Sequence, residues 1–286
     1  MSDAPLATAA AAEDAQLDAK AAALDARLAG LGSVLVAYSG GVDSAFLAIT
    51  AARVLGSRSL CITADSPSYP ERHRDLATAV AHAFNLRHEI IHTEEMARPE
   101  YRANPANRCY YCKHELYTHL SALARARGFA AVVDGSNADD RGDYRPGRQA
   151  AREFGVVSPL DESGLTKADI RLLARRAGMA TWDEPASACL SSRIPYLSEV
   201  TDEKLRTIEA AERVLRTLGF RIFRVRHHES IARLELGRDE IARALEVDLA
   251  ETIDRELRAL GYQHVTIDLR GYRLGSLNEG LPLRPV

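Results

Sequence analysis

The first half of the chain alternates short apolar runs with longer stretches of helical periodicity. Four apolar runs have the length and β-branched content of buried strands, within 33–41, 58–66, 86–95 and 129–140. A helix is predicted before them, over about 13–30. Between the runs, apolar residues recur every three or four positions, which is typical of amphipathic helices. The pattern predicts an α/β fold with a parallel sheet covered by helices on both faces.

The periodicity changes in the second half of the chain. One helix is clear at 166–178, with Thr166 as its cap, and 181–196 has no convincing period and is predicted to be an ordered loop. The elements that follow favour a smaller α+β unit: helix, two alternating runs, helix and strand, at 201–219, 220–229, 230–237, 239–261 and 262–270. We therefore expect an N-terminal helix and two domains, over 1–30, 31–196 and 197–286.

Polar clusters follow three of the predicted strands. They are SGGVDS at 39–44, TADS at 63–66 and DGSNADD at 134–140. In a parallel α/β sheet, ligands bind outside the carboxyl ends of the strands. We therefore expect the three clusters to converge on one crevice, which is the candidate ligand site.

Composition narrows the classes of protein that these elements can form. The 286 residues are 46% hydrophobic and 27% charged, and the formal net charge of −3 gives the whole chain no attraction to nucleic acid or anionic lipid. No stretch approaches the roughly 18 apolar residues of a membrane helix, and the acidic start does not resemble a secretion signal. We expect a cytoplasmic protein. Its four cysteines are too few for a disulfide scaffold, and Cys61, inside an apolar run, is predicted to pack in the core.

The cluster after the first strand, in AYSGGVDSAFLA, has the form of a phosphate-binding turn. Gly40 and Gly41 are expected to supply positive φ angles and close approach, and a helix N-terminus follows. The lysine of a P-loop and the third glycine of a dinucleotide loop are both missing. What remains is a nest of N–H groups with the hydroxyls of Ser39 and Ser44, and with Asp43 to hold Mg²⁺ against a phosphate. The alternative is a strand-to-helix turn that uses glycine for geometry alone.

SGGVDS on the first strand-helix turn resembles the PP-loop of the ATP pyrophosphatases, whose α/β domain is Rossmann-like. The resemblance implies that ATP is split between its α and β phosphates, so that a substrate is adenylated and pyrophosphate leaves. The residues implied to cradle the pyrophosphate are Ser39, Gly40, Gly41, Asp43 and Ser44. Those implied to lie close to the adenosine are Thr63 and Asp65. The loop does not select the substrate.

Three of the four cysteines are placed for chemistry. Cys109 and Cys112 lie in NRCYYCKHEL at the start of a predicted helix, with Arg108 and Lys113 beside them. Cationic neighbours and a helix N-terminus both favour thiolate over thiol. Cys189 lies in PASACLSSRIPY, far along the chain and beside an arginine.

Five motifs together resemble the LarE family of ATP-dependent sulfur transferases, which help to make the nickel-pincer nucleotide cofactor of lactate racemase. They are SGGVDS, RCYYCK, PASACLSSRIPY, FRVRHH and GYRLGSLNE. The resemblance implies adenylation of a carboxylate of pyridinium-3,5-biscarboxylic acid mononucleotide, displacement of AMP by a sulfur nucleophile, and a thiocarboxylate product. It also implies a homo-oligomer, expected to be a hexamer.

The source of the sulfur stays open at this point. In the sacrificial type of LarE, the cysteine matched by Cys189 gives up its sulfur and becomes dehydroalanine. Members with three cysteines, matched here by Cys109, Cys112 and Cys189, are associated with a [4Fe-4S] cluster, in which one iron lacks a protein ligand and can carry a replaceable sulfide. We expect the cluster. A metal-free thiol or persulfide pair, and a zinc site that uses His114, are the alternatives.

The run FRIFRVRHHE carries three arginines. By the period of a strand, Arg224 and Arg226 share one face and Arg221 lies on the other. A pair of guanidinium groups on one face suits a phosphate. The alternative is a solvated face with counter-charges such as Glu212 and Glu235.

The family resemblance favours the phosphate. It implies that Arg224 and Arg226, with Glu212 of the preceding helix, bind the phosphate of the substrate nucleotide near a subunit interface. Asp139 and Asp140 of GSNADD are candidates for a further carboxylate at the same site.

Two rival functions compete with this one, an enzyme and a protein of another class. A PP-loop tRNA thiolase also combines such loops with cysteine pairs, but 37 Lys and Arg against 40 Asp and Glu give no basic surface for RNA. A non-catalytic nucleotide-binding regulator is disfavoured by the combination of the loop, Asp43 and three cysteines.

Overall fold

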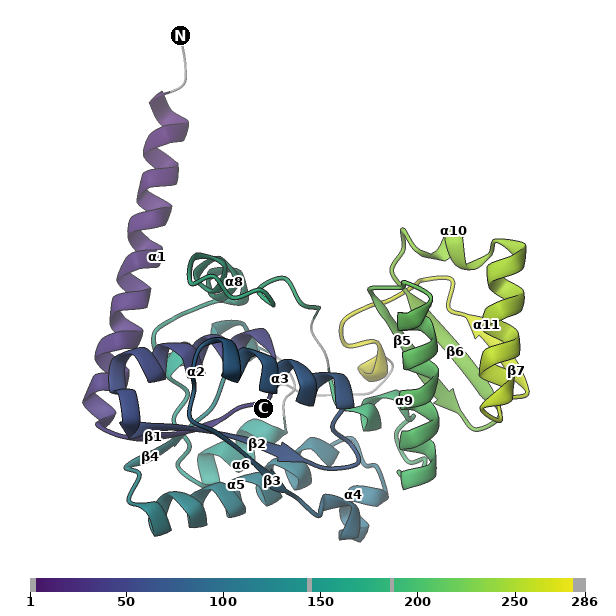
Figure 1. Cartoon of the computed structure of the whole chain (residues 1–286), viewed down its shortest axis with the longest axis horizontal. Helices are drawn as coiled ribbons and strands as arrows, with labels where there is room; N and C mark the ends of the chain where they lie inside the picture. The colour runs from purple at the N-terminus through teal and green to yellow at the C-terminus, as the bar shows by residue number, and fades with distance from the viewer. Residues whose placement is uncertain (1–3, 143–145, 186–187, 280–286) are drawn as a thin grey trace.

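The computed structural model describes residues 4–142, 146–185 and 188–279. Their strands form two sheets, which lie side by side in Figure 1. The first is a parallel sheet of order β3-β2-β1-β4, made of β1 (Val34–Ala37), β2 (Ser59–Asp65), β3 (His88–His92) and β4 (Ala131–Val133). The predicted parallel α/β fold is therefore confirmed.

Helices cover both faces of the first sheet (Figure 1). One face packs against α1 (Ala4–Leu31), α2 (Val42–Leu55), α3 (Glu71–Ala83) and α8 (Lys167–Arg176). The other packs against α5 (Arg108–Arg127) and α6 (Gly147–Glu153). Successive residues of β1 alternate between the two cores: Val34 and Val36 join the first, and Leu35 and Ala37 join the second. Cys61 is buried in the first core, as predicted.

The second sheet has the order β5-β6-β7, made of β5 (Phe223–His228), β6 (Ile231–Leu236) and β7 (His264–Ile267). β5 and β6 are antiparallel, and β6 and β7 are parallel. Its core also contains α9 (Asp202–Thr217) and α11 (Val247–Ala259). The helix predicted over 239–261 is interrupted, because Glu246 is extended, with φ −61° and ψ 131°, between α10 (Ile241–Ala244) and α11.

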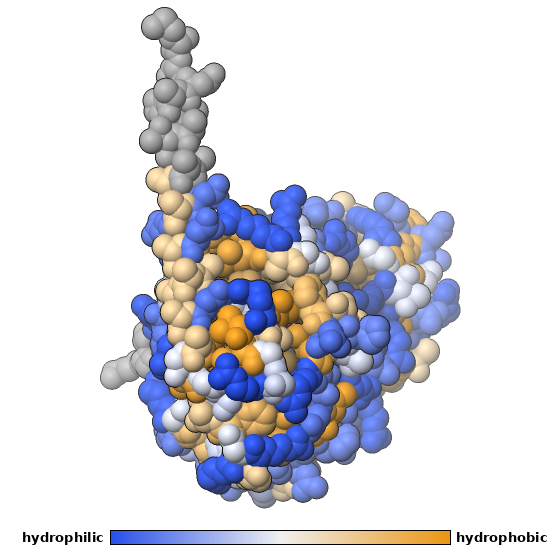
Figure 2. Space-filling view, turned by 60° about the vertical axis from the view of Figure 1, so that its left-hand side comes forward, coloured by the Kyte–Doolittle hydropathy of each residue, from blue (hydrophilic) through white to orange (hydrophobic). Residues whose placement is uncertain are grey.

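The N-terminal helix runs along one edge of the molecule in Figures 1 and 2. Leu17, Leu24 and Leu28 are buried against the first core, so the helix is held by its second half. No helix within the described residues is long and apolar enough to cross a membrane.

Residues 181–185 and 188–196 are irregular, as predicted, apart from one short 3-10 helix within them, η4 (Leu190–Arg193). Thr166 caps α8 with a reciprocal capping box to Asp169, which confirms it as the cap. Two short helices, α4 (Pro99–Arg102) and α7 (Pro159–Glu162), escaped the sequence pattern because a single turn is too short to show helical periodicity.

Candidate active site

The two glycines of the turn after β1 have different backbone conformations. Gly40 has φ +68°, and a Cβ there would lie 2.8 Å from the Cβ of Ala77, so only glycine fits. Gly41 has φ −69° and ψ 156°, and it is the N-cap of α2. The expected positive φ is therefore wrong for Gly41, because that residue already has the extended backbone from which a helix begins.

The loop leaves the start of α2 without a side-chain cap. Ser44 Oγ donates to Gly41 O at 3.0 Å and accepts from Ser39 N at 3.2 Å, and the two serine hydroxyls are 3.1 Å apart. These bonds hold the turn together. Because the first N–H groups of a helix lack intrahelical partners, the start of α2 offers them to an anion.

Asp43, in the first turn of α2, faces two residues from distant segments. Its Oδ2 accepts from Lys167 Nζ at 3.1 Å and from Asn137 Nδ2 at 3.3 Å. Its Oδ1 is buried and has no hydrogen-bond partner among the described residues. Sequence reasoning missed Lys167, and the only signal for it was the capped helix that begins there.

The segment after β4 meets the same turn. A Cβ on Gly135 would lie 2.9 Å from Ser44 N, so the two loops are in close backbone contact. Asp140 lies in the 3-10 helix η3 (Ala138–Gly142), where its Oδ2 accepts from Asn137 N at 3.1 Å. The predicted convergence of the first and third polar clusters is confirmed. Asn137 links the two, because it donates to both Asp43 and Asp140.

The end of β2 supplies Thr63 and Asp65. Thr63 Oγ1 donates to Tyr38 O and lies 2.8 Å from His88 Nε2, so this hydroxyl is engaged within the fold. Asp65 accepts from Arg74 Nη1 at 3.0 Å. Both residues thus lie at the carboxyl edge of the sheet, with side chains that already have protein partners.

The loop around Cys189, residues 188–193 (the Cys189 loop), is anchored beside the carboxyl edge of the first sheet. Leu190 N donates to Ser68 O at 2.9 Å, in the segment after β2. Ser191 Oγ lies 2.6 Å from Tyr101 Oη, and Ser191 O accepts from Arg108 Nη1 at 3.0 Å. The loop is therefore tied both to the nucleotide edge of the sheet and to the start of α5, where Cys109 and Cys112 lie.

Glu95 completes this neighbourhood. Its carboxylate is buried and accepts from Ser66 Oγ at 2.5 Å and from Ser68 Oγ at 2.7 Å. Its charge acts on Cys112 and helps to raise the pKa of that thiol. Nothing in the sequence pattern singled out Glu95, because its partners come from a loop about thirty residues away.

The three thiols lie close enough to influence one another. The pKa of Cys112 is raised well above its ordinary value by desolvation first and then by Glu95 and Cys189. Desolvation also raises the pKa of Cys109, against the opposing charge of Arg108. Arg108 and Lys113 lower the pKa of Cys109, as the sequence predicts, but desolvation outweighs them, so that the pKa is raised overall. Cys112 packs against the apolar cluster that contains Tyr101, and loss of solvation there outweighs the nearby positive charge.

A buried ion pair connects the Cys189 loop to the second sheet. Arg193 Nε donates to Glu212 Oε1 at 2.8 Å, and its Nη1 donates to Cys189 O at 3.1 Å. Glu212 also accepts from Val225 N at 3.2 Å. The structure thus places Glu212 next to the two predicted phosphate ligands of β5, with its carboxylate oriented by Arg193.

Arg224 and Arg226 share a face of β5, as predicted, and both are buried. Arg226 Nη1 donates to Ser192 O at 2.5 Å and its Nη2 donates to Glu235 Oε2 at 2.8 Å. Arg224 stacks on Tyr272, with its Cζ 4.8 Å from the ring centre. The alternative of a solvated sheet face is therefore wrong as to solvent, but Glu235 is a counter-charge of Arg226, as that alternative expected.

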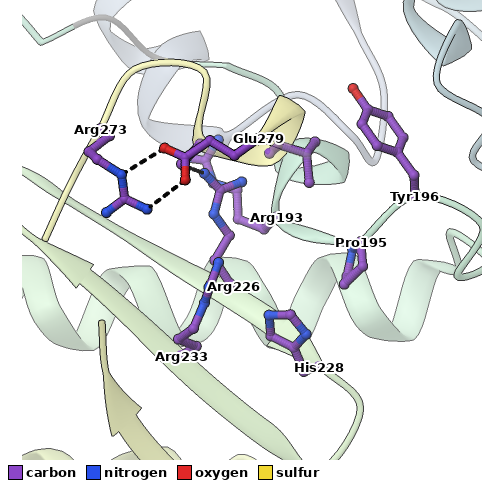
Figure 3. A pocket seen from close by; sticks show the side chains of 10 residues that line it. Arg193, Pro195, Tyr196, Arg226, His228, Arg233, Arg273 and Glu279 are labelled. Atoms are coloured by element: carbon purple, nitrogen blue, oxygen red, sulfur yellow. Dashed lines mark hydrogen bonds and ion pairs between the residues drawn. The ribbon is translucent and has the colours of Figure 1, made fainter. Parts of the chain in front are cut away.

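A basic pocket opens where η4, β5, β6 and the C-terminal segment meet (Figure 3). Its volume is about 400 Å³. It is lined by His228 and by four guanidinium groups, those of Arg193, Arg226, Arg233 and Arg273, and Glu279 pairs with Arg273 at its rim. The Nε groups of Arg226 and Arg233 are buried without a partner among the described residues. Both guanidinium groups also pair with carboxylates, Arg226 with Glu235 and Arg233 with Glu235 and Asp268.

Comparisons with known proteins agree with this arrangement. The family model described as asparagine synthase matches residues 17–251. A protein of Lactiplantibacillus plantarum named pyridinium-3,5-bisthiocarboxylic acid mononucleotide synthase is 36% identical over 240 residues, which cover 84% of this chain and 86% of that protein. The chain belongs to the LarE family of ATP-dependent sulfur transferases. The resemblance drawn from the five motifs is confirmed.

Two further relatives of this LarE-family chain are uncharacterized proteins. One, from Synechocystis sp., is 45% identical over 240 residues, covering 84% of this chain and 89% of the relative. The other, from Methanocaldococcus jannaschii, is 30% identical over 231 residues, covering 81% and 87%. An ATP-using, adenylating activity follows from the family, while the source of the sulfur does not.

Proposed function

We propose that this LarE-family chain activates a carboxylate of pyridinium-3,5-biscarboxylic acid mononucleotide with ATP and converts it to a thiocarboxylate. The carboxylate attacks the α phosphate of ATP, so that an acyl adenylate forms and pyrophosphate leaves. A sulfide sulfur then attacks the acyl carbon, and AMP departs with the electron pair of the broken C–O bond. The product class matches the name of the Lactiplantibacillus plantarum relative.

The position of the Cys189 loop carries this proposal. Leu190 N binds Ser68 O on the nucleotide side, and Ser192 O binds Arg226 on the side of the basic pocket. A mononucleotide whose phosphate lies in the basic pocket can thus present its ring toward Cys189 and the glycine turn. The four arginines that line the pocket, Arg193, Arg226, Arg233 and Arg273, support a phosphate there.

Mg²⁺ fits the glycine turn. The buried Oδ1 of Asp43 lacks a partner among the described residues, and a carboxylate oxygen is the ligand that Mg²⁺ prefers. In the proposed complex, the N–H groups at the start of α2 bind the leaving pyrophosphate, and Asp43 holds the ion against it. Ser39, Gly40, Gly41 and Ser44 form the wall of this site.

Three cysteine thiols are the ligand set that a [4Fe-4S] cluster with one open iron would use. The charges of Cys189 and Cys109 act on Cys112, and that of Cys189 acts on Cys109, which supports a site that the three thiols share. No three His, Cys, Asp or Glu side chains within the described ranges form a group that could hold one metal ion. When bound, the cluster would supply a sulfide that can be replaced after each turnover. Sulfur donation by Cys189 itself is the second candidate, because its thiol belongs to the same proposed site.

The functional test uses protein purified without oxygen. Iron and sulfide are measured, ATP and the dicarboxylate mononucleotide are added, and AMP, pyrophosphate and the intact protein mass are then recorded. The proposed cluster route predicts bound iron, thiocarboxylate product and an unchanged protein mass. If the protein is iron-free and loses the mass of one H₂S for each product formed, the sulfur comes from Cys189 and the cluster route is wrong. Absence of AMP and pyrophosphate would overturn the proposed function.

Specificity for the mononucleotide is tested against tRNA in the same assay. The proposal predicts no thiolated tRNA and no tRNA retained at moderate salt, because the cationic pocket holds one phosphate and the chain has no net positive charge. We further propose a homohexamer in the cytoplasm, with residues 31–196 and 197–286 as its two domains. Light scattering tests the hexamer, and limited proteolysis tests the boundary between the two domains.

A further inference from the structure

The segment between β2 and α3 contains a tight turn, residues 66–69, with one proline inside it and another directly after it. Tyr69 N donates to Ser66 O at 3.0 Å, which closes a four-residue turn with Pro67 in its second position. Proline is favoured there because its ring already fixes φ near the value that the turn needs. Pro70 follows as the N-cap of α3. The 66–69 turn is therefore made stiff by its own sequence.

Glu95, the first residue of the 3-10 helix η2 (Glu95–Ala97), holds this turn from inside the protein. Only 2% of Glu95 is exposed. Its Oε1 accepts from Ser66 Oγ at 2.5 Å and from Ser68 Oγ at 2.7 Å, and the two hydroxyl oxygens are 3.0 Å apart. Burial of a carboxylate is costly unless hydrogen bonds compensate it, and both of these bonds come from the turn. Glu95 therefore fixes the turn against the segment that follows β3.

Two adjacent residues of the turn contact the two loops that the proposed reaction needs. Tyr69 Oη donates to Ser39 O at 3.0 Å, in the glycine turn. Ser68 O accepts from Leu190 N at 2.9 Å, in the Cys189 loop. The 66–69 turn thus connects the proposed ATP site to the proposed sulfur site through one hydrogen bond on each side. A shift of this turn would change the distance between the two loops.

We propose that Glu95 is a positioning residue for sulfur transfer: by holding the 66–69 turn, it keeps the Cys189 loop at a fixed place relative to the glycine turn. This assignment rests on the proposed function and adds a residue to it. An acyl adenylate reacts with water unless sulfur reaches the acyl carbon first, and a displacement of about 1 Å between reacting groups slows a reaction by about 100-fold. Loss of the connection should therefore release AMP without transfer of sulfur.

The first test measures amide hydrogen exchange in the full-length protein before ATP or substrate is added. Glu95→Ala removes the acceptor of both serine hydroxyls, so the Leu190 amide should exchange at least about tenfold faster, the effect of losing one hydrogen bond to a charged group. Glu94→Ala, at the exposed neighbouring position, is the matched control. Rates are compared with that of the amide of Leu35, which is buried in β1. Equal relative rates for Leu190 in Glu95→Ala and the control would overturn the proposal.

A smaller change keeps this test decisive if Glu95→Ala does not fold. Ser68→Ala removes one of the two serine donors but keeps the backbone oxygen that binds Leu190. It should also speed exchange of the Leu190 amide. Glu95→Gln retains an acceptor oxygen at the same place, so most of the protection should return in that variant. An unchanged rate in Ser68→Ala, or a Glu95→Gln protein that exchanges as fast as Glu95→Ala, would contradict the assignment.

The second test compares the two halves of the reaction in the same variants. Glu95→Ala should retain substrate-dependent exchange of pyrophosphate into ATP, because the glycine turn is also held by its own serine bonds. The thiocarboxylate formed per AMP should fall by about tenfold or more, since the sulfur is misplaced. Glu95→Gln should recover most of this ratio. If it is as defective as Glu95→Ala, Glu95 acts through its charge on Cys112 and the positioning role is wrong.

The two tests separate this assignment from the proposed function. A wild type that releases no AMP would overturn the proposed function, while exchange of the Leu190 amide still decides whether Glu95 holds the connection. A Glu95→Ala protein with the wild-type ratio of thiocarboxylate to AMP would overturn the positioning role and leave the proposed function intact.

Discussion

Lys167 Nζ lies 3.1 Å from Asp43 Oδ2, although the two residues are 124 positions apart. The glycine turn contains no lysine of its own, and the fold brings one to it from the first residue of α8. The glycine turn therefore lacks a lysine in its sequence but has one beside it in the folded protein. A cation at this place can contact Asp43 in the free protein and the phosphates of ATP in the complex.

Replacement of Lys167 should impair adenylation. Lys167→Met is expected to lower the rate of pyrophosphate release by about 100-fold, the usual effect of losing one preorganised charge at a phosphate. Lys20→Met is a matched control, because Lys20 pairs with Asp169 on the same helix but lies at α1. Pyrophosphate release in the two variants can be compared directly. A Lys167→Met rate within twofold of the control would contradict the role of this lysine.

Replacement of Cys189 should separate the two halves of the reaction. Cys189→Ser retains the glycine turn and Asp43, so substrate-dependent exchange of pyrophosphate into ATP should persist. Formation of thiocarboxylate should stop, because the loop no longer presents sulfur between the nucleotide edge and the basic pocket. Mass spectrometry of the nucleotide product measures the second half. Full thiocarboxylate formation by this variant would remove Cys189 from the sulfur site.

Gly40 should tolerate no side chain. With φ +68° and a Cβ position 2.8 Å from the Cβ of Ala77, Gly40→Ala is expected to lower the free energy of unfolding by about 2 kcal/mol or more. Gly30→Ala lies inside α1 with no atom near its Cβ, and it should be stabilising by up to about 1 kcal/mol. Urea denaturation measures both. A free energy of unfolding for Gly40→Ala equal to or above that of the wild type would show that the turn can adapt to a side chain.

Stability should fall in mild acid through His73. Burial, reinforced by the charge of Arg193, lowers the pKa of His73 to about 4 in the folded protein, against about 6.5 in the unfolded chain. Between these values the unfolded chain binds the proton first, so the free energy of unfolding decreases as the pH falls. The loss is on the order of 2 kcal/mol. Urea denaturation over this pH range should show a shallower slope for His73→Gln. An unchanged slope would assign the acid sensitivity to other groups.

The sequence pattern predicted what depends on local periodicity and on the topology of parallel sheets. The strands of the first sheet, the cap at Thr166 and the convergence of two polar clusters all follow from such rules. Lys167 and Glu95 could not be found in this way, because their roles come from partners on other segments. The desolvation that raises the pKa of Cys112 was missed for a related reason: it depends on the packing around Tyr101, which no single segment reveals.

The most direct test of the account measures the sulfur-containing mononucleotide and the released AMP in the same reaction. Wild-type protein, purified without oxygen, is given ATP, Mg²⁺, sulfide and pyridinium-3,5-biscarboxylic acid mononucleotide, and the products are quantified by mass spectrometry. The account predicts one AMP for each oxygen atom that is replaced by sulfur in the mononucleotide, and no such product from Cys189→Ser. AMP without sulfur in the nucleotide, or no AMP at all, would contradict it.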